Sequence, residues 1–164
     1  MTEPQRQQRN EEKLMELFPA FAVRVAKVIG GLEAMGIRPR IQDAYRSPQD
    51  QLIAFNTGHS KLKFGFHNVT GPNGEKQSLA VDLLDDDNPL NLSINYLLKL
   101  AVLSEENGLI TGIRWGVPKT LQESINAAIA NRKFDTQLKI GWDPSHVQPT
   151  GITSTEARAG KRPQ

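Results

Sequence analysis

The stretch Ser78-Leu79-Ala80-Val81-Asp82-Leu83-Leu84 predicts a buried strand, because a short apolar run of this length fits a strand in a protein core. The polar run Asp85-Asp86-Asp87-Asn88-Pro89 follows and ends it. Asp82 is the exception within the strand, since a carboxylate is expensive to bury unless it binds a metal or pairs with a cation. Taken alone, Asp82 is also explained as a strand end that faces water.

Hydrophobic periodicity on both sides of this strand predicts alternating helices and strands. Between residues 11 and 35, apolar residues recur at three- and four-residue steps, which indicates an amphipathic helix, with Pro19 as a kink or a restart. Ser47 and Pro48 are a favourable cap and first residue for another helix. The predicted elements in chain order are a helix over 11–35, a strand over 37–45, a helix from 47 to about 57, an irregular loop over 59–77, the strand over 78–84, a helix over 93–107, a strand over 110–115, a helix over 118–132 and a strand over 138–142. We therefore expect an α+β fold with a small mixed or antiparallel sheet flanked by helices.

Length and the character of the chain ends predict one domain with polar extensions. At 164 residues the chain is long enough for one domain and short for two. We expect a disordered lead-in over 1–10, the domain over 11–150 and a disordered tail over 151–164. The N-terminus lacks the basic-then-apolar order of a secretory signal, and no apolar run approaches the roughly 20 residues that span a bilayer. The expectation is a monomer made in the cytoplasm without a signal peptide and without a membrane partner.

Composition narrows the chemistry that the chain can carry. It has no cysteine, which excludes disulfides, thiol nucleophiles and Cys-ligated zinc, so any metal site must use His, Asp or Glu. The formal charge of +2 and the pI near 9.0 suit an anionic partner such as a cell-wall polymer or nucleic acid. No Lys/Arg-rich block with interleaved aromatic residues is present, so we expect no nucleic-acid partner.

Two histidines change the interpretation of Asp82. His67 lies in Gly65-Phe66-His67-Asn68, and His146 lies in Trp142-Asp143-Pro144-Ser145-His146. Each alone is most simply a loop or turn histidine. Together with Asp82 they supply three ligands, the usual number for a catalytic zinc with an open fourth position. Asp143 is a further carboxylate beside His146, and it can serve as the base that metal-assisted hydrolysis requires.

These segments resemble the metal-binding pattern of a family of zinc peptidases. The relevant stretches are Gly65-Phe66-His67-Asn68-Val69-Thr70, Ser78-Leu79-Ala80-Val81-Asp82 and Trp142-Asp143-Pro144-Ser145-His146. The family comprises D-alanyl-D-alanine carboxypeptidases and L-alanyl-D-glutamate endopeptidases and includes many phage endolysins. The resemblance extends over about residues 38 to 149. It implies that His67, Asp82 and His146 ligate Zn²⁺ and that Asp143 is the catalytic base.

Three further residues enter through the same resemblance. Tyr45-Arg46-Ser47-Pro48 resembles the family's Tyr-Arg-Ser motif, which implies that Arg46 and Tyr45 bind the substrate, with Arg46 holding a carboxylate. Without the resemblance, a salt bridge from Arg46 to Asp43 or Asp50 at the start of the helix is an equal alternative. Trp115 falls where the family has a Trp-Gly pair that lines the site, and its alternative is a place in the core.

The sequence departs from the family pattern in the region before Asp82. Gly65 stands where the family has serine, and Ser78 stands where it has glycine. His67 and Asp82 are 82 − 67 = 15 residues apart, about twice the spacing of the family pattern. A turn at Gly71-Pro72-Asn73-Gly74 allows the extra residues to form an excursion that leaves the two ligands close together. His59 is a lower-ranked alternative ligand.

The resemblance implies an enzyme, a zinc metallopeptidase that hydrolyses a peptide bond in peptidoglycan stem peptides. Whether it cuts a D-Ala-D-Ala or an L-Ala-D-Glu bond, as a carboxypeptidase or an endopeptidase, stays open. Without a signal peptide, it would reach the cell wall as a phage or prophage lysis enzyme or as part of a virion. One alternative is a catalytically degenerate member of the fold that binds the wall or a partner protein, which the Gly65 and Ser78 departures favour. A small nucleic-acid binder is the other, and it rests on the pI alone.

Overall fold

The computed structural model describes residues 1–164 and contains one sheet of four strands. The strands are β1 (Pro39–Asp43), β2 (Val81–Asp85), β3 (Leu109–Gly112) and β4 (Asp143–Pro149), in the spatial order β1-β2-β4-β3. Every neighbouring pair is antiparallel. The predicted α+β class is therefore confirmed, with the antiparallel form of the sheet.

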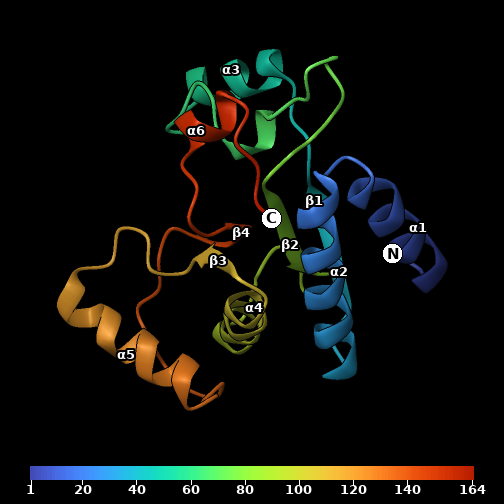
Figure 1. The fold of residues 1–164 in the computed structure, drawn as a ribbon. Helices are drawn as coiled ribbons and strands as arrows, with labels where there is room; N and C mark the ends of the chain where they lie inside the picture. The colour runs from blue at the N-terminus through green and yellow to red at the C-terminus, as the bar shows by residue number, and fades with distance from the viewer.

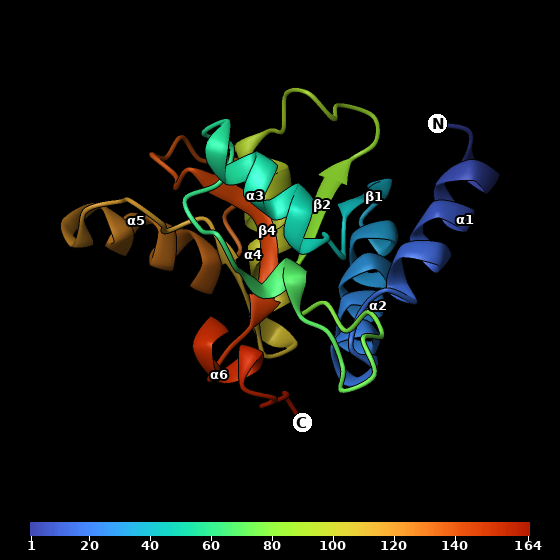
Figure 2. The ribbon, with the colours of Figure 1, turned by 90° about the horizontal axis from the view of Figure 1, so that it is seen from above.

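Helices cover both sides of this sheet. They are α1 (Glu3–Leu14), α2 (Pro19–Ala34), α3 (Pro48–Asn56), the short 3-10 helix η1 (Phe66–Asn68), α4 (Ile94–Glu106), α5 (Lys119–Ala130) and α6 (Ser154–Arg158). Figures 1 and 2 show α2 and α4 on one side of the sheet, and α3 with the loop after it on the other. None of the helices combines the length and the apolar character needed to cross a bilayer.

The hydrophobic core lies between the sheet and the helices α2 and α4. Helix α2 contributes its buried face at three- and four-residue steps, as the sequence periodicity predicts. The buried residues of that face are Phe21, Val25, Val28, Ile29 and Leu32. Strand β2 contributes Val81 and Leu83, which point to the core side while Asp82 between them points to the other side. The alternation of side chains along a strand thus removes Asp82 from the apolar core and directs it toward the site.

The single helix predicted over 11–35 is wrong, because the chain breaks between α1 and α2. Leu17 forms a parallel bridge with Ser78, and the Phe18 amide donates a hydrogen bond of 3.0 Å to the Ser78 carbonyl. Pro19 is the first residue of α2. A backbone N–H at this position has no partner within a helix, so proline loses no hydrogen bond there. Pro19 therefore marks a restart, one of the two alternatives that the sequence offered.

Residues 1–10, predicted to be a disordered lead-in, instead form most of α1. Arg6 is only 1% exposed and Asn10 is also buried. The Arg6 guanidinium and the Asn10 amide donate to the Pro39 carbonyl at 2.6 and 2.9 Å, and the Ile41 amide donates to Asn10 Oδ1 at 2.8 Å. Strand β1 is at the edge of the sheet, so polar side chains of α1 satisfy its free backbone groups. A polar segment is ordered here because it covers a strand edge.

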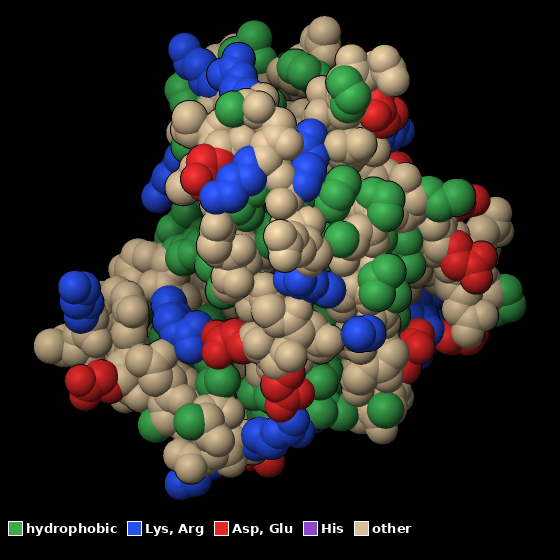
Figure 3. All heavy atoms as spheres, in the orientation of Figure 1, with side chains coloured by type: hydrophobic (Ala, Val, Ile, Leu, Met, Phe, Trp, Pro, Cys, Tyr) green, Lys and Arg blue, Asp and Glu red, His purple; other side chains and the backbone are tan.

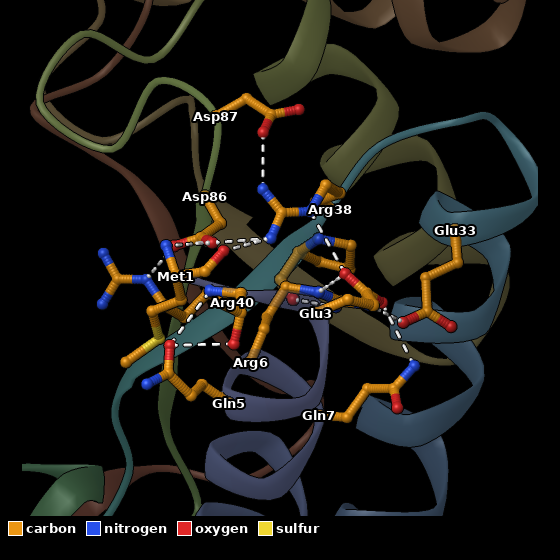
Figure 4. A network of polar contacts seen from close by, with 12 residues as sticks. Met1, Glu3, Gln5, Arg6, Gln7, Glu33, Arg38, Arg40, Asp86 and Asp87 are labelled. Atoms are coloured by element: carbon orange, nitrogen blue, oxygen red, sulfur yellow. Dashed lines mark hydrogen bonds and ion pairs between the residues drawn. The ribbon is translucent and has the colours of Figure 1, made fainter.

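An ionic network extends from α1 to the turn after β2, as Figure 4 shows. Arg38 pairs with Glu3 at 3.1 Å and with Asp87 at 2.7 Å. Arg40 pairs at 2.8 Å with Asp86, whose side chain is nearly buried. The same acidic run that ends β2 therefore helps to hold α1 and the start of β1 in place.

The tail over 151–164, also predicted to be disordered, contains α6 and docks on the domain. Ala157 in α6 is buried, and the Arg162 guanidinium donates to the Thr70 carbonyl at 2.7 Å and to Gln77 Oε1 at 2.9 Å. These hydrogen bonds connect the tail to the loop between η1 and β2. The prediction failed because the residues that order the tail are far from it in the sequence.

Candidate metal centre

The pairing of β2 with β4 brings the first two candidate ligands together. Asp82 lies directly opposite His146 in the antiparallel register. Residues opposite each other in such a pair project to the same face of the sheet. The segment 143–149, which the sequence indicated as a turn following a strand over 138–142, is itself the strand β4. The last strand therefore begins later than predicted and carries the histidine on a rigid element.

The third candidate ligand comes from η1, which two backbone hydrogen bonds hold beside the sheet. The Arg46 amide donates to the His67 carbonyl at 2.9 Å, and the Leu79 amide donates to the Phe66 carbonyl at 2.9 Å. The first bond fixes η1 to the segment after β1, and the second fixes it to the residues just before β2. His67 is buried as a result.

His67, Asp82 and His146 form one cluster, with ligand atoms that all lie within 4.8 Å of one another. Asp82 Oδ2 is 3.5 Å from His67 Nε2, and Asp82 Oδ1 is 3.4 Å from His146 Nδ1. The two imidazole rings meet edge to face, with centroids 5.2 Å apart and an interplanar angle of 77°. The structure thus brings together all three ligands that the resemblance implies.

Hydrogen bonds to the outer nitrogen of each histidine test whether the cluster suits a metal. His67 Nδ1 is 2.6 Å from the Ala44 carbonyl oxygen, which can only accept, so Nδ1 carries the proton and Nε2 keeps its lone pair. His146 Nε2 is 3.0 Å from Gln148 Oε1, which likewise leaves Nδ1 free. Both free nitrogens face Asp82. Ligating histidines in metal sites have this second hydrogen bond, and two imidazoles with one carboxylate are a zinc donor set, so the residues fit the metal.

The charges in the cluster interact strongly. Burial alone disfavours the ionised form of Asp82, but the two histidines beside it outweigh that effect and hold the pKa of its carboxyl well below the usual range. Burial also acts against a charged His67, but the Asp82 carboxylate raises the pKa of that imidazole. Asp82 is therefore an anion at neutral pH, the form that ligates a cation.

Asp143 stands beside the cluster without belonging to it. Its Oδ2 lies 3.8 Å from His146 Nδ1, and its side chain is one-third exposed. Burial and the nearby Asp82 carboxylate raise the pKa of Asp143 above its usual value. A carboxylate with a raised pKa at the edge of a metal-capable cluster is a more effective proton acceptor than an ordinary surface aspartate.

The cluster opens into a pocket of about 430 Å³. Arg46 lines it, although its guanidinium donates to Asp43 Oδ2 at 2.8 Å and to Gln51 Oε1 at 3.2 Å. The salt-bridge alternative for Arg46 is thus present together with its position in the pocket. Trp115 also lines the pocket, with its ring centroid 5.2 Å from that of His146.

Tyr45 and His59 do not join the cluster. Tyr45 is absent from the pocket wall, and its ring instead lies beneath Lys76, 5.5 Å from the ammonium. The predicted role of Tyr45 in substrate binding therefore stays a prediction, and its ring lies outside the wall of this pocket. His59 lines the outer part of the pocket, but its Nδ1 is 2.9 Å from Thr57 Oγ1 and it is not among the clustered ligands.

The two departures from the family pattern are accommodated locally. Ser78 is fully buried, and its hydroxyl lies 2.8 Å from the Ala80 carbonyl and 3.0 Å from the Ala44 carbonyl. The Gly65 amide donates to Asn68 Oδ1 at 2.8 Å and closes the turn of η1. The long segment before Asp82 forms an excursion closed by a Thr70–Lys76 bridge, which confirms that the extra residues leave the ligands together.

Several residues of the pocket were not predicted from the sequence, and tertiary contacts bring them there. Gln148 follows His146 by two residues, so strand alternation could have indicated that both lie on one face. Gln51 reaches the pocket from α3, and no local pattern distinguishes it. Lys61 and Trp142 meet across the pocket mouth from distant segments, with the ammonium 4.6 Å from the ring centroid.

Comparison with known proteins finds likenesses among solved structures. No family model matches the chain. No curated protein matches it either. Among solved structures, the chain is similar to the L-Ala D-Glu endopeptidase ChiX of Serratia marcescens, at 22% sequence identity over 87% of this chain and 86% of that chain, with a TM-score of 0.49.

Proposed function

We propose that the protein is a zinc-dependent peptidase that hydrolyses a peptide bond in peptidoglycan stem peptides. One observation carries the proposal: the free nitrogens of His67 and His146 converge on the Asp82 carboxylate, with the outer nitrogens held by Ala44 and Gln148. The substrate class follows from the resemblance of the motifs around these ligands. The bond cut, D-Ala-D-Ala or L-Ala-D-Glu, is an outcome of the experiment below.

In this proposal the ligands and the base have separate roles. His67, Asp82 and His146 would hold the zinc, which when bound polarises a carbonyl and lowers the pKa of a water. Asp143 takes the proton of the attacking water and transfers it to the nitrogen of the leaving amine. That transfer needs a carboxylate that accepts a proton readily, which agrees with the raised pKa of Asp143.

The pocket walls would orient the peptide. Arg46 presents a guanidinium whose remaining N–H groups can bind a substrate carboxylate, and its bonds to Asp43 and Gln51 hold it in one position. Trp115 offers a flat apolar surface beside His146, against which a peptide side chain can pack.

The proposal is tested by digesting purified sacculi with and without a chelator and identifying the new termini by mass spectrometry. We expect cleavage that the chelator abolishes and zinc restores, with about one zinc bound per chain. The termini distinguish the two candidate bonds. A protein that binds no stoichiometric zinc contradicts the proposal, and zinc binding without cleavage favours the degenerate wall-binding alternative.

Substitution of the base separates metal binding from catalysis. Asp143→Asn should lower the cleavage rate by at least about 10²-fold while zinc content stays near that of the wild type, because Asp143 acts as a general base and not as a ligand. His146→Ala should lose both the bound zinc and the cleavage activity. Asp135→Asn, at an exposed aspartate outside this pocket, is the matched control and should retain both.

A further inference from the structure

Lys61 and Trp142 form a contact at the mouth of the pocket that the proposed chemistry does not use. The Lys61 ammonium lies 4.6 Å from the centroid of the Trp142 ring, and both residues line the same pocket as the metal cluster. The Trp142 side chain is 55% exposed, a large fraction for a tryptophan. Its ring also lies 5.6 Å from that of Trp115, so a continuous aromatic wall leads inward from Lys61.

Lys61 has no anionic partner. The Lys61 ammonium forms no ion pair and no side-chain hydrogen bond, and it contacts the Trp142 ring. Arg46, by contrast, is paired with Asp43 at 2.8 Å. A lysine over an aromatic face keeps its three N–H donors available, because the ring attracts the charge without accepting them in line.

The charges around the pocket decide where an anionic ligand can bind. Figure 3 shows Lys and Arg side chains in the upper part of the view, around α6. Within the cavity, Arg46 would bind one substrate carboxylate, and the Asp143 carboxylate repels any further anion that approaches it. A second carboxylate of the substrate is therefore best placed at the mouth, against Lys61.

We propose that Lys61, positioned by the Trp142 ring, is a specificity-determining residue that binds a carboxylate of the substrate peptide away from the bond that is cut. This inference rests on the proposed peptidase function and deepens it. The substrate class is an anionic peptide. The protein should prefer a stem peptide whose group facing Lys61 is a free carboxylate. The same peptide with a primary amide in that place should be the poorer substrate.

The exposure of Lys61 and of the substrate carboxylate determines how strongly the carboxylate peptide should be preferred. A lysine–carboxylate pair at an open site contributes up to about 1 kcal/mol, which corresponds to about a fivefold preference. Because the charges are near solvent, raising the salt to about 0.5 M should reduce the preference. Trp142→Phe keeps an aromatic face and should retain part of the preference, whereas Trp142→Leu should lose it.

The test measures kcat/KM for a matched pair of synthetic stem peptides, one with the free carboxylate and one with the amide. The wild type should favour the carboxylate peptide about fivefold, and Lys61→Met should bring the two values within about twofold of each other. Lys63→Met is the matched control, since Lys63 is an exposed lysine on the same loop whose ammonium lies over Phe55, outside the pocket wall. It should keep the wild-type ratio. Equal values in the wild type, or an unchanged ratio in Lys61→Met, overturns the proposal.

A binding measurement distinguishes failure of this proposal from failure of the peptidase assignment. Calorimetric titration of the Asp143→Asn variant with each peptide should show tighter binding of the carboxylate form, and adding Lys61→Met should remove the difference. If neither peptide is cleaved but this binding difference is found, the peptidase function fails and the carboxylate site stands. If both are cleaved without a binding difference, the carboxylate site fails and the peptidase function stands.

Discussion

At the scale of single residues, the site depends on which nitrogen of each histidine lacks a proton. The Ala44 carbonyl accepts from His67 Nδ1 at 2.6 Å, so Nε2 faces Asp82. The Gln148 side chain lies 3.0 Å from His146 Nε2, so Nδ1 faces Asp82. The two rings use different nitrogens because one approaches from η1 and the other from β4. Gln148 is therefore a positioning residue for the ligand beside it.

Replacing Gln148 tests this role directly. Gln148→Leu should lower the zinc affinity by about 10- to 100-fold, because His146 loses the acceptor that selects its tautomer. The dissociation constant is measured by competition with a chromophoric chelator. Gln148→Glu keeps an acceptor and should restore most of the affinity. The exposed Gln137→Leu is the control, and wild-type affinity in Gln148→Leu would contradict the role.

At the scale of the elements, α1 is the least expected part of the fold and one of the most connected. It lies along the edge strand β1 in Figures 1 and 2, and its polar side chains complete the hydrogen bonds of that edge. Arg6 is central, since it contacts the Pro39 carbonyl, Glu3 and Glu33 while almost fully buried. Helix α1 therefore protects a strand edge that would otherwise pair with other chains.

Removing the buried guanidinium should weaken the whole domain. Arg6→Ala is expected to lower the free energy of unfolding by about 2 kcal/mol, through the loss of charged hydrogen bonds and of the packed side-chain stem. The measurement is denaturant unfolding followed by circular dichroism. Gln8→Ala, at an exposed position of the same helix, should change it by less than about 0.5 kcal/mol. A similar effect for both variants would show that Arg6 has no special role.

The same network predicts how stability depends on pH. Hydrogen bonds from Arg6 and Arg38 lower the pKa of Glu3 from 4.5 to about 2. Because the folded-state pKa is the lower one, the contribution of Glu3 is present above pH 4.5 and is lost as the pH falls toward 2. Unfolding free energies measured across this range should therefore converge for the wild type and Glu3→Gln at low pH. Parallel curves for the two proteins would contradict the shift.

At the scale of the whole molecule, the two ends of the chain stabilise opposite parts of the domain. The N-terminal helix holds β1, while Arg162 near the C-terminus holds the loop between η1 and β2 through Thr70 and Gln77. That loop joins two of the candidate zinc ligands. The tail therefore supports the site from a distance, although it contributes no residue to the pocket wall.

Removing the Arg162 side chain should loosen this loop selectively. Arg162→Ala is expected to increase amide hydrogen exchange over residues 70–77 and to lower the unfolding free energy by about 1–2 kcal/mol. Hydrogen exchange with mass spectrometry locates the change. Lys161→Ala removes an exposed pair with Glu156 within the tail and should leave exchange in the loop unchanged. Uniformly faster exchange throughout Arg162→Ala would indicate general destabilisation instead.

Much of the fold and of the metal cluster was predictable from local patterns. The order of the central elements follows from periodicity, and Ser47 caps α3 as expected, accepting from the Asp50 amide at 3.1 Å. Asp82 was identifiable as a carboxylate within an apolar strand. The break at Leu17 and the late start of β4 were not, because each depends on pairing with a segment distant in sequence.

By itself, the sequence determined the element types and the kinds of donor available, because periodicity and side-chain chemistry are local properties. Only the tertiary structure decided that Asp82 lies opposite His146, which ring nitrogens face it, and that Lys61 meets Trp142 at the pocket mouth. It also decided that the polar ends are ordered, since their partners are backbone groups of β1 and of the loop before β2. The physical reason is that strand register and long-range hydrogen bonds join residues that are far apart in the sequence. The local sequence around one such residue contains no information about its distant partner.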